Sequence, residues 1–443
     1  MRKKYFYGAA LLASMFIFSC KQTDQIVDQN VTPGPVIPTP STNELYTYYA
    51  SPTDPTNAQM LDAMWAKAEK LTVSAVVPNP APPKLFQGYW GDTYSVDLRS
   101  ITDTVGGYIY FLAEWADPSK GFTQAPFYFD TTSHRWVKEP SSPQFDTING
   151  LMTKYGYNED KFAFLWNIST PSFASQSCYG TCHTYYGNAA NTGALNSGTG
   201  NHWTNTYLEK IDQWHLFMMR GSYYKQCSDE FQDDGYSGAG TSTYTASSTN
   251  GRHVDQVGGL GSKGPGNNQQ TLKLSNKNTV SVTVPRWIYA PGYTPVGDKA
   301  YYILDQDTLT SNLKIILAVD SMGVLSYGSA AGGNVEGTID PNTDNGYWPR
   351  SNSLPALKAI QSILVAPYVG GRADVGAFMH HDGAKWHLIL KRKLKTDDVL
   401  KQDVDFSDRT DKQFGIGVFN NANNQHAIVP GLILKFKKTT ATN

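Results

Sequence analysis

"YIYFLAEWA" (residues 108–116) and "DKFAFLWNI" (residues 160–168) are short runs of aromatic and aliphatic side chains, and "KWHLILKRKL" (residues 385–394) largely alternates apolar with polar positions. Such runs are typical of β-strands that place one or both faces against a core. Turn-forming stretches precede all three: "VGG", "YGYNED" and "HDGAK". Helical periodicity is confined to residues 57–71 and 354–364. Many short strands with few helices predict a mainly β fold, a β-sandwich with a few short helices.

The composition is that of a globular protein with enough apolar residues for a large core. The chain has 443 residues, of which 40% are hydrophobic and 13% aromatic, and its formal net charge is −1. Binding to nucleic acid needs a basic patch that neutralises phosphates, and no long basic stripe occurs in the sequence. We therefore expect no nucleic-acid partner.

Residues 1–20 have the pattern of a bacterial export signal. A basic start is followed by an apolar run from Tyr5 to Phe18, which is too short to span a bilayer as a stable anchor. The ending "IFSC" resembles a lipobox, which implies cleavage before Cys20 and lipidation of its thiol; a plain signal peptide cleaved nearby is the alternative. Residues 21–44 are polar and proline-rich, so we expect a tether that links a lipid in the membrane of the bacterial cell envelope to the folded part.

We expect one β-domain from residue 45 to residue 443. Between Asp233 and Asn278 the composition changes to Gly, Ser, Thr and Asn, with too few apolar residues for a separate core. Residues 237–280 are therefore predicted to form a long, flexible Gly/Ser-rich insertion.

The string "CYGTCH" (residues 178–183) places two thiols directly ahead of an imidazole in a chain with only four cysteines. In c-type cytochromes two cysteines bind the haem vinyl groups and the next histidine binds the iron, usually as C-x-x-C-H. Here Cys178 and Cys182 enclose three residues, and Gly180 gives the backbone the freedom to bulge. This pattern favours haem attachment through Cys178 and Cys182, with His183 as an iron ligand.

Two other chemistries are open to these cysteines. A disulfide between Cys178 and Cys182 is sterically possible in an oxidising compartment, but it leaves His183 without a role. A zinc site needs two further ligands, and no second pair occurs at a suitable spacing. Under the haem interpretation, Cys227 is an unpaired thiol.

Further strings around this motif resemble the haem-binding family related to the gamma subunit of ethylbenzene dehydrogenase. "YIYFLAEWADPS", "EDKFAFLWNI", the cysteine motif and "DQWHLFMMRG" follow the family's order, and "RADVGAFMHHDGAKWHLILKRKL", "DVDF" and "FGIGVFNNANNQHAIV" are similar to its closing strands. The resemblance covers most of residues 85–430. It implies a β-sandwich, related in shape to some carbohydrate-binding modules, that holds one haem and passes electrons. Founding members hold b-type haem through methionine and lysine, whereas members with a C-x-x-C-H motif look like c-type cytochromes.

The resemblance also suggests the second iron ligand. His215 corresponds to the histidine in the family's "WHWK"-like pattern, although Leu216 and Phe217 stand where that pattern has Trp and Lys. We therefore expect His183 and His215 to bind the iron from opposite sides. A histidine that is merely hydrogen-bonded at a strand edge is the alternative for His215.

Met379 is the next candidate for this position. It alternates with Ala377 and Val375, so its thioether should point inward, where packing in the core is the alternative role. Met218 and Met219, which follow His215, could also supply a thioether ligand. His380 and His381, which follow Met379, could supply an imidazole.

The leading interpretation is an envelope-anchored electron-transfer protein with one haem c and a redox partner protein. Cycling of iron needs no general base or nucleophile, and the chain contains no G-x-S-x-G, H-E-x-x-H or P-loop motif. We thus expect an electron carrier or a subunit of a redox complex rather than a stand-alone enzyme. Two alternatives stay open: a surface glycan-binding β-sandwich without haem, given ten Trp and 27 Tyr, and a haem enzyme or sensor with an open sixth position.

Overall fold

The computed structural model describes residues 43–50, 62–77, 93–141, 144–145, 152–154, 157–173, 204, 208–233, 251–255, 266–290, 303–304, 313–329, 333–343, 350–351, 354–423 and 426–436. The chain is mainly β, with 53% strand and 5% helix, which confirms the predicted fold class. Within these residues no helix has the length and apolar character needed to cross a membrane.

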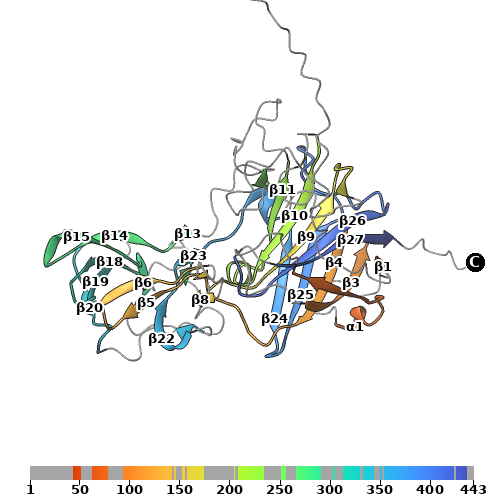
Figure 1. The fold of residues 1–443 in the computed structure, drawn as a ribbon. Helices are drawn as coiled ribbons and strands as arrows, with labels where there is room; N and C mark the ends of the chain where they lie inside the picture. Colours follow the sequence, from red (N-terminus) through yellow and green to blue (C-terminus); the bar gives the residue numbers. More distant parts are fainter. Residues whose placement is uncertain are drawn as a thin grey trace, which may run out of the picture.

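A sheet of twelve strands forms the larger part of the molecule (Figure 1). Its strand order is β12-β11-β10-β9-β26-β27-β1-β3-β4-β25-β24, and β2 pairs with β27 and β3. The strands are β1 (Glu44–Tyr49), β2 (Leu71–Val76), β3 (Thr93–Asp103), β4 (Tyr108–Ala116), β9 (Lys161–Asn167), β10 (Ile211–Phe217), β11 (Ser228–Gln232), β12 (Arg252–Val254), β24 (Gly376–His381), β25 (Lys385–Lys393), β26 (Lys412–Phe419) and β27 (Ala427–Phe436). All three sequence runs that decide the fold class form strands of this sheet: β4, β9 and β25.

The sheet curls around a single core. The segment leading into β11 meets the start of β24, where Gln226 forms a bridge with Gly376 and the Cys227 N–H donates to the Val375 carbonyl at 2.9 Å. One face of nearly every strand therefore points into the same apolar interior. This closure produces the two facing layers of a β-sandwich.

Aromatic side chains fill much of this interior. In β4 the inward positions are occupied by Phe111 and Trp115, while Leu112 on the other face packs with Trp65 of the short helix α1 (Asp62–Trp65). Phe111 lies 5.1 Å from Trp166 and 5.7 Å from Trp214, measured between ring centroids. Strict alternation along β4, β9 and β10 thus places three strands' aromatic residues in one cluster.

A second group of strands has its own hydrophobic core and forms the smaller lobe in Figure 1. Phe127, Trp136, Trp287 and Leu325 are among its buried residues. Its sheets contain β5 (Phe127–Asp130), β6 (Arg135–Lys138), β13 (Gly266–Asn267), β14 (Gln270–Leu274), β15 (Lys277–Val284), β16 (Trp287–Tyr289), β17 (Ile303–Leu304), β18 (Leu313–Val319), β19 (Leu325–Ser329), β20 (Gly337–Ile339), β21 (Arg350–Ser351), β22 (Leu354–Ile360) and β23 (Ile363–Val365), and a separate pair joins β7 (Gln144–Phe145) to β8 (Met152–Lys154).

Two local predictions are wrong. Within the predicted insertion, residues 237–280, β12 pairs with β11 and β13 pairs with β23. Its C-terminal end also forms β14 and the first half of β15, because the apolar residues of these two strands pack on the core of the smaller lobe. Residues 354–364 form strands β22 and β23 instead of a helix, since β22 pairs with β5 and tertiary pairing outweighs a weak helical pattern. In the described part of the other predicted helix, residues 62–71, the α-helix covers Asp62–Trp65.

The turn after β10 is held by a buried carboxylate. Glu159 is 0% exposed and accepts the backbone N–H groups of Met219 and Arg220 at 2.9 and 3.0 Å, at the start of helix α3 (Met218–Ser222). The same carboxylate forms an ion pair with the Arg220 guanidinium. Glu159 therefore joins the segment before β9 to the end of β10.

Replacing this carboxylate should destabilise the fold. Glu159→Gln leaves Arg220 without its partner and weakens two backbone bonds, so we expect a loss of about 3 kcal/mol in the free energy of unfolding. Urea titration followed by tryptophan fluorescence measures the change. Glu44→Gln, which alters a half-buried carboxylate at the start of β1 that pairs with Lys435, should unfold at nearly the wild-type urea concentration. Equal midpoints for the two variants would contradict this role of Glu159.

Candidate functional site

The predicted site residues fall into two groups. Cys178, Cys182 and His183 lie outside the described residues, as does Cys20. His215 and Met379 lie within them. The attachment motif therefore stays a sequence prediction. The structure gives the surroundings of the two other candidate ligands, His215 and Met379.

His215 lies in the middle of β10, on the outer face of the large sheet. Its neighbours Trp214 and Leu216 point into the main core, so alternation turns the imidazole away from that core. β10 is paired on both sides, with β9 and β11, and His215 stands opposite Ala163 and Ser228. The ring is nonetheless 5% exposed. It is a buried histidine in the interior of the sheet, which excludes the alternative of a strand-edge residue.

Neither ring nitrogen of His215 makes a hydrogen bond within the described part of the chain. The nearest charged group is Glu230 of β11, whose Oε2 lies 3.8 Å from Nδ1, beyond hydrogen-bond distance. The ring itself packs on Phe217, with 4.1 Å between centroids, and on Phe419 at 5.5 Å. The neutral form of this buried ring therefore has a nitrogen lone pair that accepts no hydrogen bond from the described residues.

The protonation states of this pair follow from burial and charge. Burial lowers the pKa of His215 to about 4, against the opposing attraction of Glu230. Burial alone would raise the pKa of Glu230, but Arg252, at 3.3 Å, and His215 outweigh it and bring that pKa to about 2. At neutral pH the site therefore holds a neutral imidazole beside an ionised carboxylate.

The two residues beside His215 across the sheet, in the direction of β26, are small. Ala163 of β9 is its direct neighbour, and Gly417 of β26 is the next residue across. A Cβ at Gly417 would lie 3.3 Å from His426 and 3.5 Å from Phe419, so these two rings pack over the glycine. His426 stacks on Phe419 with 4.3 Å between centroids. The face thus carries two imidazoles, one on each side of Phe419.

Lys161 adds an amine to the same face. It is 2% exposed, its Nζ bonds to the Ala422 carbonyl, and it lies 5.3 Å from the centroid of Phe419. Burial lowers its pKa to about 7. Sequence reasoning missed Lys161, Glu230 and His426. Alternation could have placed Lys161 and Glu230 on one face of their strands, but only the pairing of β9, β10, β11 and β26 brings them near His215.

Met379 lies on the opposite side of the sheet from His215. Its side chain packs against the main core beside Ala377, as its alternation predicted. The structure therefore does not bring His215 and Met379 together. Met218 and Met219 are fully buried in the main core as well. Cys227 is a free, buried thiol there, and burial raises its pKa.

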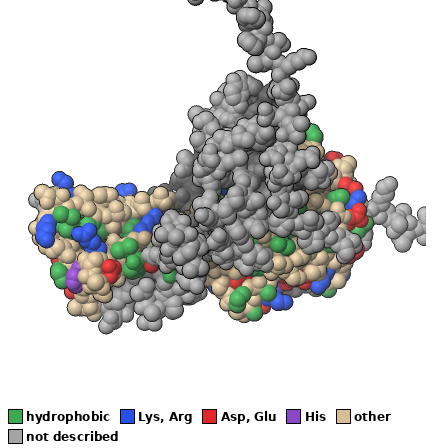
Figure 2. All heavy atoms as spheres, in the orientation of Figure 1, with side chains coloured by type: hydrophobic (Ala, Val, Ile, Leu, Met, Phe, Trp, Pro, Cys, Tyr) green, Lys and Arg blue, Asp and Glu red, His purple; other side chains and the backbone are tan. Residues whose placement is uncertain are grey.

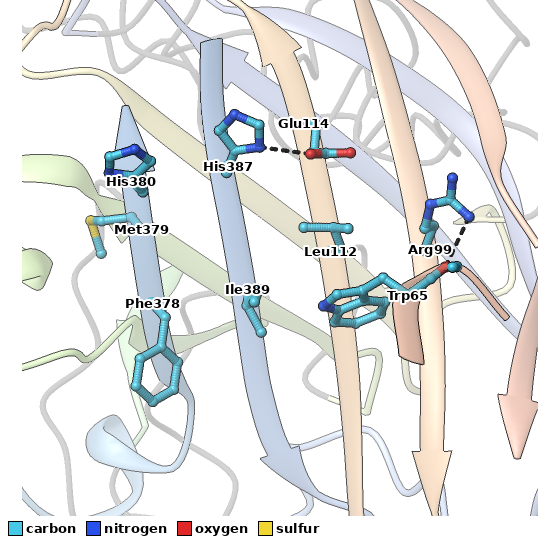
Figure 3. A pocket seen from close by; sticks show the side chains of 10 residues that line it. Trp65, Arg99, Leu112, Glu114, Phe378, Met379, His380, His387 and Ile389 are labelled. Carbon is cyan, nitrogen blue, oxygen red and sulfur yellow. Dashed lines mark hydrogen bonds and ion pairs between the residues drawn. The ribbon is translucent and has the colours of Figure 1, made fainter. Parts of the chain in front are cut away.

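A groove of about 530 Å³ borders Met379 and lies on the outer face of β4, β25 and β24 (Figure 3). His387 stands between two carboxylates, with Nδ1 2.6 Å from Glu114 and Nε2 3.1 Å from Asp382. Arg99 donates to the backbone carbonyl of Trp65 at 3.0 Å. These polar groups already have partners and Trp65 is 5% exposed, so the groove's more accessible aromatic side chain is the half-buried Phe378.

The described surface carries charges of both signs. In Figure 2, Lys and Arg side chains are scattered over the smaller lobe among apolar and uncharged ones, and acidic and basic side chains are mixed along the edge of the large sheet.

The protein is a β-sandwich whose outer face carries a buried imidazole, and neither nitrogen of this ring has a hydrogen-bond partner among the described residues. The chain belongs to the ethylbenzene dehydrogenase family, whose sequence model matches residues 62–428. A search among curated proteins found no match. Among solved structures, a candidate carbohydrate-binding protein from Bacteroides uniformis ATCC 8492 is 7% identical, with 89% of this chain and 99% of that chain covered, but the TM-score of 0.26 gives it no weight in the argument.

The buried imidazole should make stability depend on pH. Because the pKa of His215 is about 4 in the fold and about 6.5 in the unfolded chain, the unfolded chain binds more protons between these values. The contribution of the neutral ring is complete above pH 6.5 and is lost as pH falls through 4, a change of roughly 3 kcal/mol. Urea unfolding of haem-free protein at pH 7 and pH 4.5 should show a wild-type loss that His215→Gln lacks. Parallel pH dependence of the two proteins would contradict a buried neutral ring.

Proposed function

We propose that this protein binds one haem c and passes single electrons to and from a redox partner protein in the bacterial cell envelope. The observation that carries the proposal is His215: a buried, neutral imidazole whose nitrogens have no hydrogen-bond partner among the described residues. Burying such a group without a partner costs about 1–3 kcal/mol. A metal centre that takes the lone pair removes this cost.

The donor set suits haem iron. Imidazole is a common axial ligand of haem, and a metal-binding histidine usually turns its second ring N–H toward a carboxylate or a carbonyl. Glu230 is the carboxylate on the Nδ1 side of His215, which leaves Nε2 as the nitrogen for iron.

The attachment motif supplies the rest of the proposed site. Cys178 and Cys182 would hold the haem through thioether bonds, and His183 would bind the iron opposite His215. Haem, when bound, supplies one-electron chemistry between ferrous and ferric iron. The protein's own part is to fix both imidazoles, to keep His215 neutral and to exclude water with Phe217 and Phe419. These are the requirements of an electron carrier, which needs no general base or nucleophile.

Membership of the ethylbenzene dehydrogenase family supports the relation to haem-binding gamma subunits. The glycan-binding alternative has less support, since the groove in Figure 3 buries its tryptophan. An absorption spectrum of protein matured in a host with cytochrome c assembly separates the two: a haem spectrum that survives acid-acetone extraction is expected. A colourless protein would overturn haem binding, and extraction of all haem would overturn covalent attachment.

His215→Ala should change the iron without releasing the haem. With Cys178 and Cys182 intact the haem stays attached, but loss of one strong-field imidazole should convert a low-spin, six-coordinate centre to a high-spin one. Absorption and electron paramagnetic resonance spectra of the oxidised protein measure the change.

Met379→Ala is the matched control, because Met379 lies on the core side of the sheet. It should leave the low-spin signature in place. A high-spin spectrum for Met379→Ala, with an unchanged one for His215→Ala, would assign the sixth ligand to the C-terminal strands instead.

The lipid anchor is a separate part of the proposal. Cleavage before Cys20 and lipidation of its thiol would tether the folded part to the membrane through residues 21–44. Cys20→Ser should move the protein from the membrane fraction to the soluble one and change its electrophoretic mobility. Unchanged fractionation and mobility would reject the anchor while leaving the haem proposal intact.

A further inference from the structure

Five aspartates come together at one end of the main core, and we call them the interior aspartate cluster. Carboxylate oxygens of Asp212, Asp229 and Asp403 lie within 4.8 Å of one another, and those of Asp255, Asp374 and Asp403 do the same. Five segments supply them: β10, β11, the residue after β12, the residue after the 3₁₀ helix η5 (Gly370–Ala373), and the loop between β25 and β26. Asp229 and Trp214 are cross-strand partners on the inward face.

Among the inner three aspartates, Asp212 and Asp403 contact one positive charge, that of Arg392. Its guanidinium reaches Asp212 Oδ2 at 2.8 Å and Asp403 Oδ2 at 3.0 Å. Three carboxylates against one guanidinium leave a net charge of −2 when all are ionised. Burying uncompensated charge in an apolar interior is costly. The cluster therefore needs either further positive charge or bound protons.

Four carboxylate oxygens of the inner three aspartates have no hydrogen-bond partner among the described residues. They are Asp212 Oδ1, Asp403 Oδ1 and both oxygens of Asp229. Asp229 is 0% exposed, and its oxygens lie in the group that also contains Asp212 and Asp403. Arg392 and the Val404 N–H already engage the second oxygen of Asp212. The unused oxygens thus belong to three buried aspartates whose carboxylates approach one another within 4.8 Å.

We propose that the interior aspartate cluster binds one calcium ion through Asp212, Asp229 and Asp403. Calcium binds oxygen at about 2.4 Å, so its ligand oxygens lie no more than about 4.8 Å apart, and one carboxylate oxygen from each of these three aspartates meets this limit. A divalent ion also neutralises the remaining charge of −2. Magnesium suits the site less, because it usually keeps several waters, and zinc prefers nitrogen and sulfur ligands.

The outer aspartates connect this site to the surface. Asp374 is exposed, whereas Asp403 belongs to both groups and is buried. Asp255 lies directly over Gly371, where an added Cβ would stand 2.4 Å from Oδ2, so the close approach requires glycine. An acidic route from Asp374 to Asp403 gives a cation access to the interior.

Calcium titration of the full matured chain, stripped with EDTA, tests the proposal. Isothermal titration calorimetry should show one bound ion. Calcium a hundredfold above its Kd should raise Tm by about 3 °C, and EDTA should reverse the shift. Asp229→Asn should abolish both effects, whereas Asp411→Asn, which alters an exposed aspartate, should keep them. If calcium gives no heat and no shift, and Asp229→Asn is as stable as the wild type, Asp229 is a protonated acid and the proposal is overturned.

A second measurement holds even if Asp229→Asn fails to fold. Terbium(III), which occupies calcium sites, should luminesce in haem-free protein when tryptophan is excited, because Trp214 is the cross-strand partner of Asp229. Calcium should displace the signal, and Trp214→Phe should reduce it by more than half. A signal that survives Trp214→Phe unchanged would place the ion elsewhere and overturn the assignment. None of these readouts requires haem, so their failure would leave the proposed electron carrier standing.

Discussion

The ion pair between Arg392 and Asp212 organises one end of the main core. Both side chains are buried, and the two residues are 180 positions apart in the sequence. Arg392 also contacts Asp403, so a single guanidinium joins β25, β10 and the loop before β26. A buried pair of this kind is weak evidence for stability in itself, but removing one partner leaves a charge in an apolar setting at a cost of about 3–5 kcal/mol. The strands that carry these residues therefore have little freedom to shift.

The ion pair also fixes the outer face of the sheet, because β10 carries both Asp212 and His215. Alternation sends Asp212, Trp214 and Leu216 inward, while Gln213, His215 and Phe217 point outward. β11 divides its residues in the same way, with Asp229 inside and Glu230 beside His215. The two proposed sites are thus opposite faces of one hairpin. A one-residue slip in its register would expose apolar residues and separate both sets of partners at once.

Local pattern was enough to predict the strands but not all of their neighbours. β4, β9 and β25 appeared in the sequence because aromatic runs and alternation are properties of a few consecutive residues. Residues 266–280 and 354–364 were misjudged, because their strands are decided by pairing with distant segments. The same limit applies to the sites. His215 was found through its surroundings in the sequence, whereas Glu230 and Lys161 matter only through register, and the aspartates are brought together by the closure of the sheet.

A histidine fixed in this way is suited to electron transfer. β10 is hydrogen-bonded along both edges, so the backbone that carries His215 cannot move without breaking the pairing with β9 and β11. The ring packs between Phe217 and Phe419, and Glu230 is held in turn by Arg252 and Ser228. A ligand with so few alternative positions keeps the same geometry in both oxidation states of a metal. The charges inside the sheet also affect this rigidity. Asp212 and Asp229 lie on the inner face of β10 and β11, so a positive charge or a proton that neutralises them stabilises both strands. The same strands hold His215 in place on the outer face.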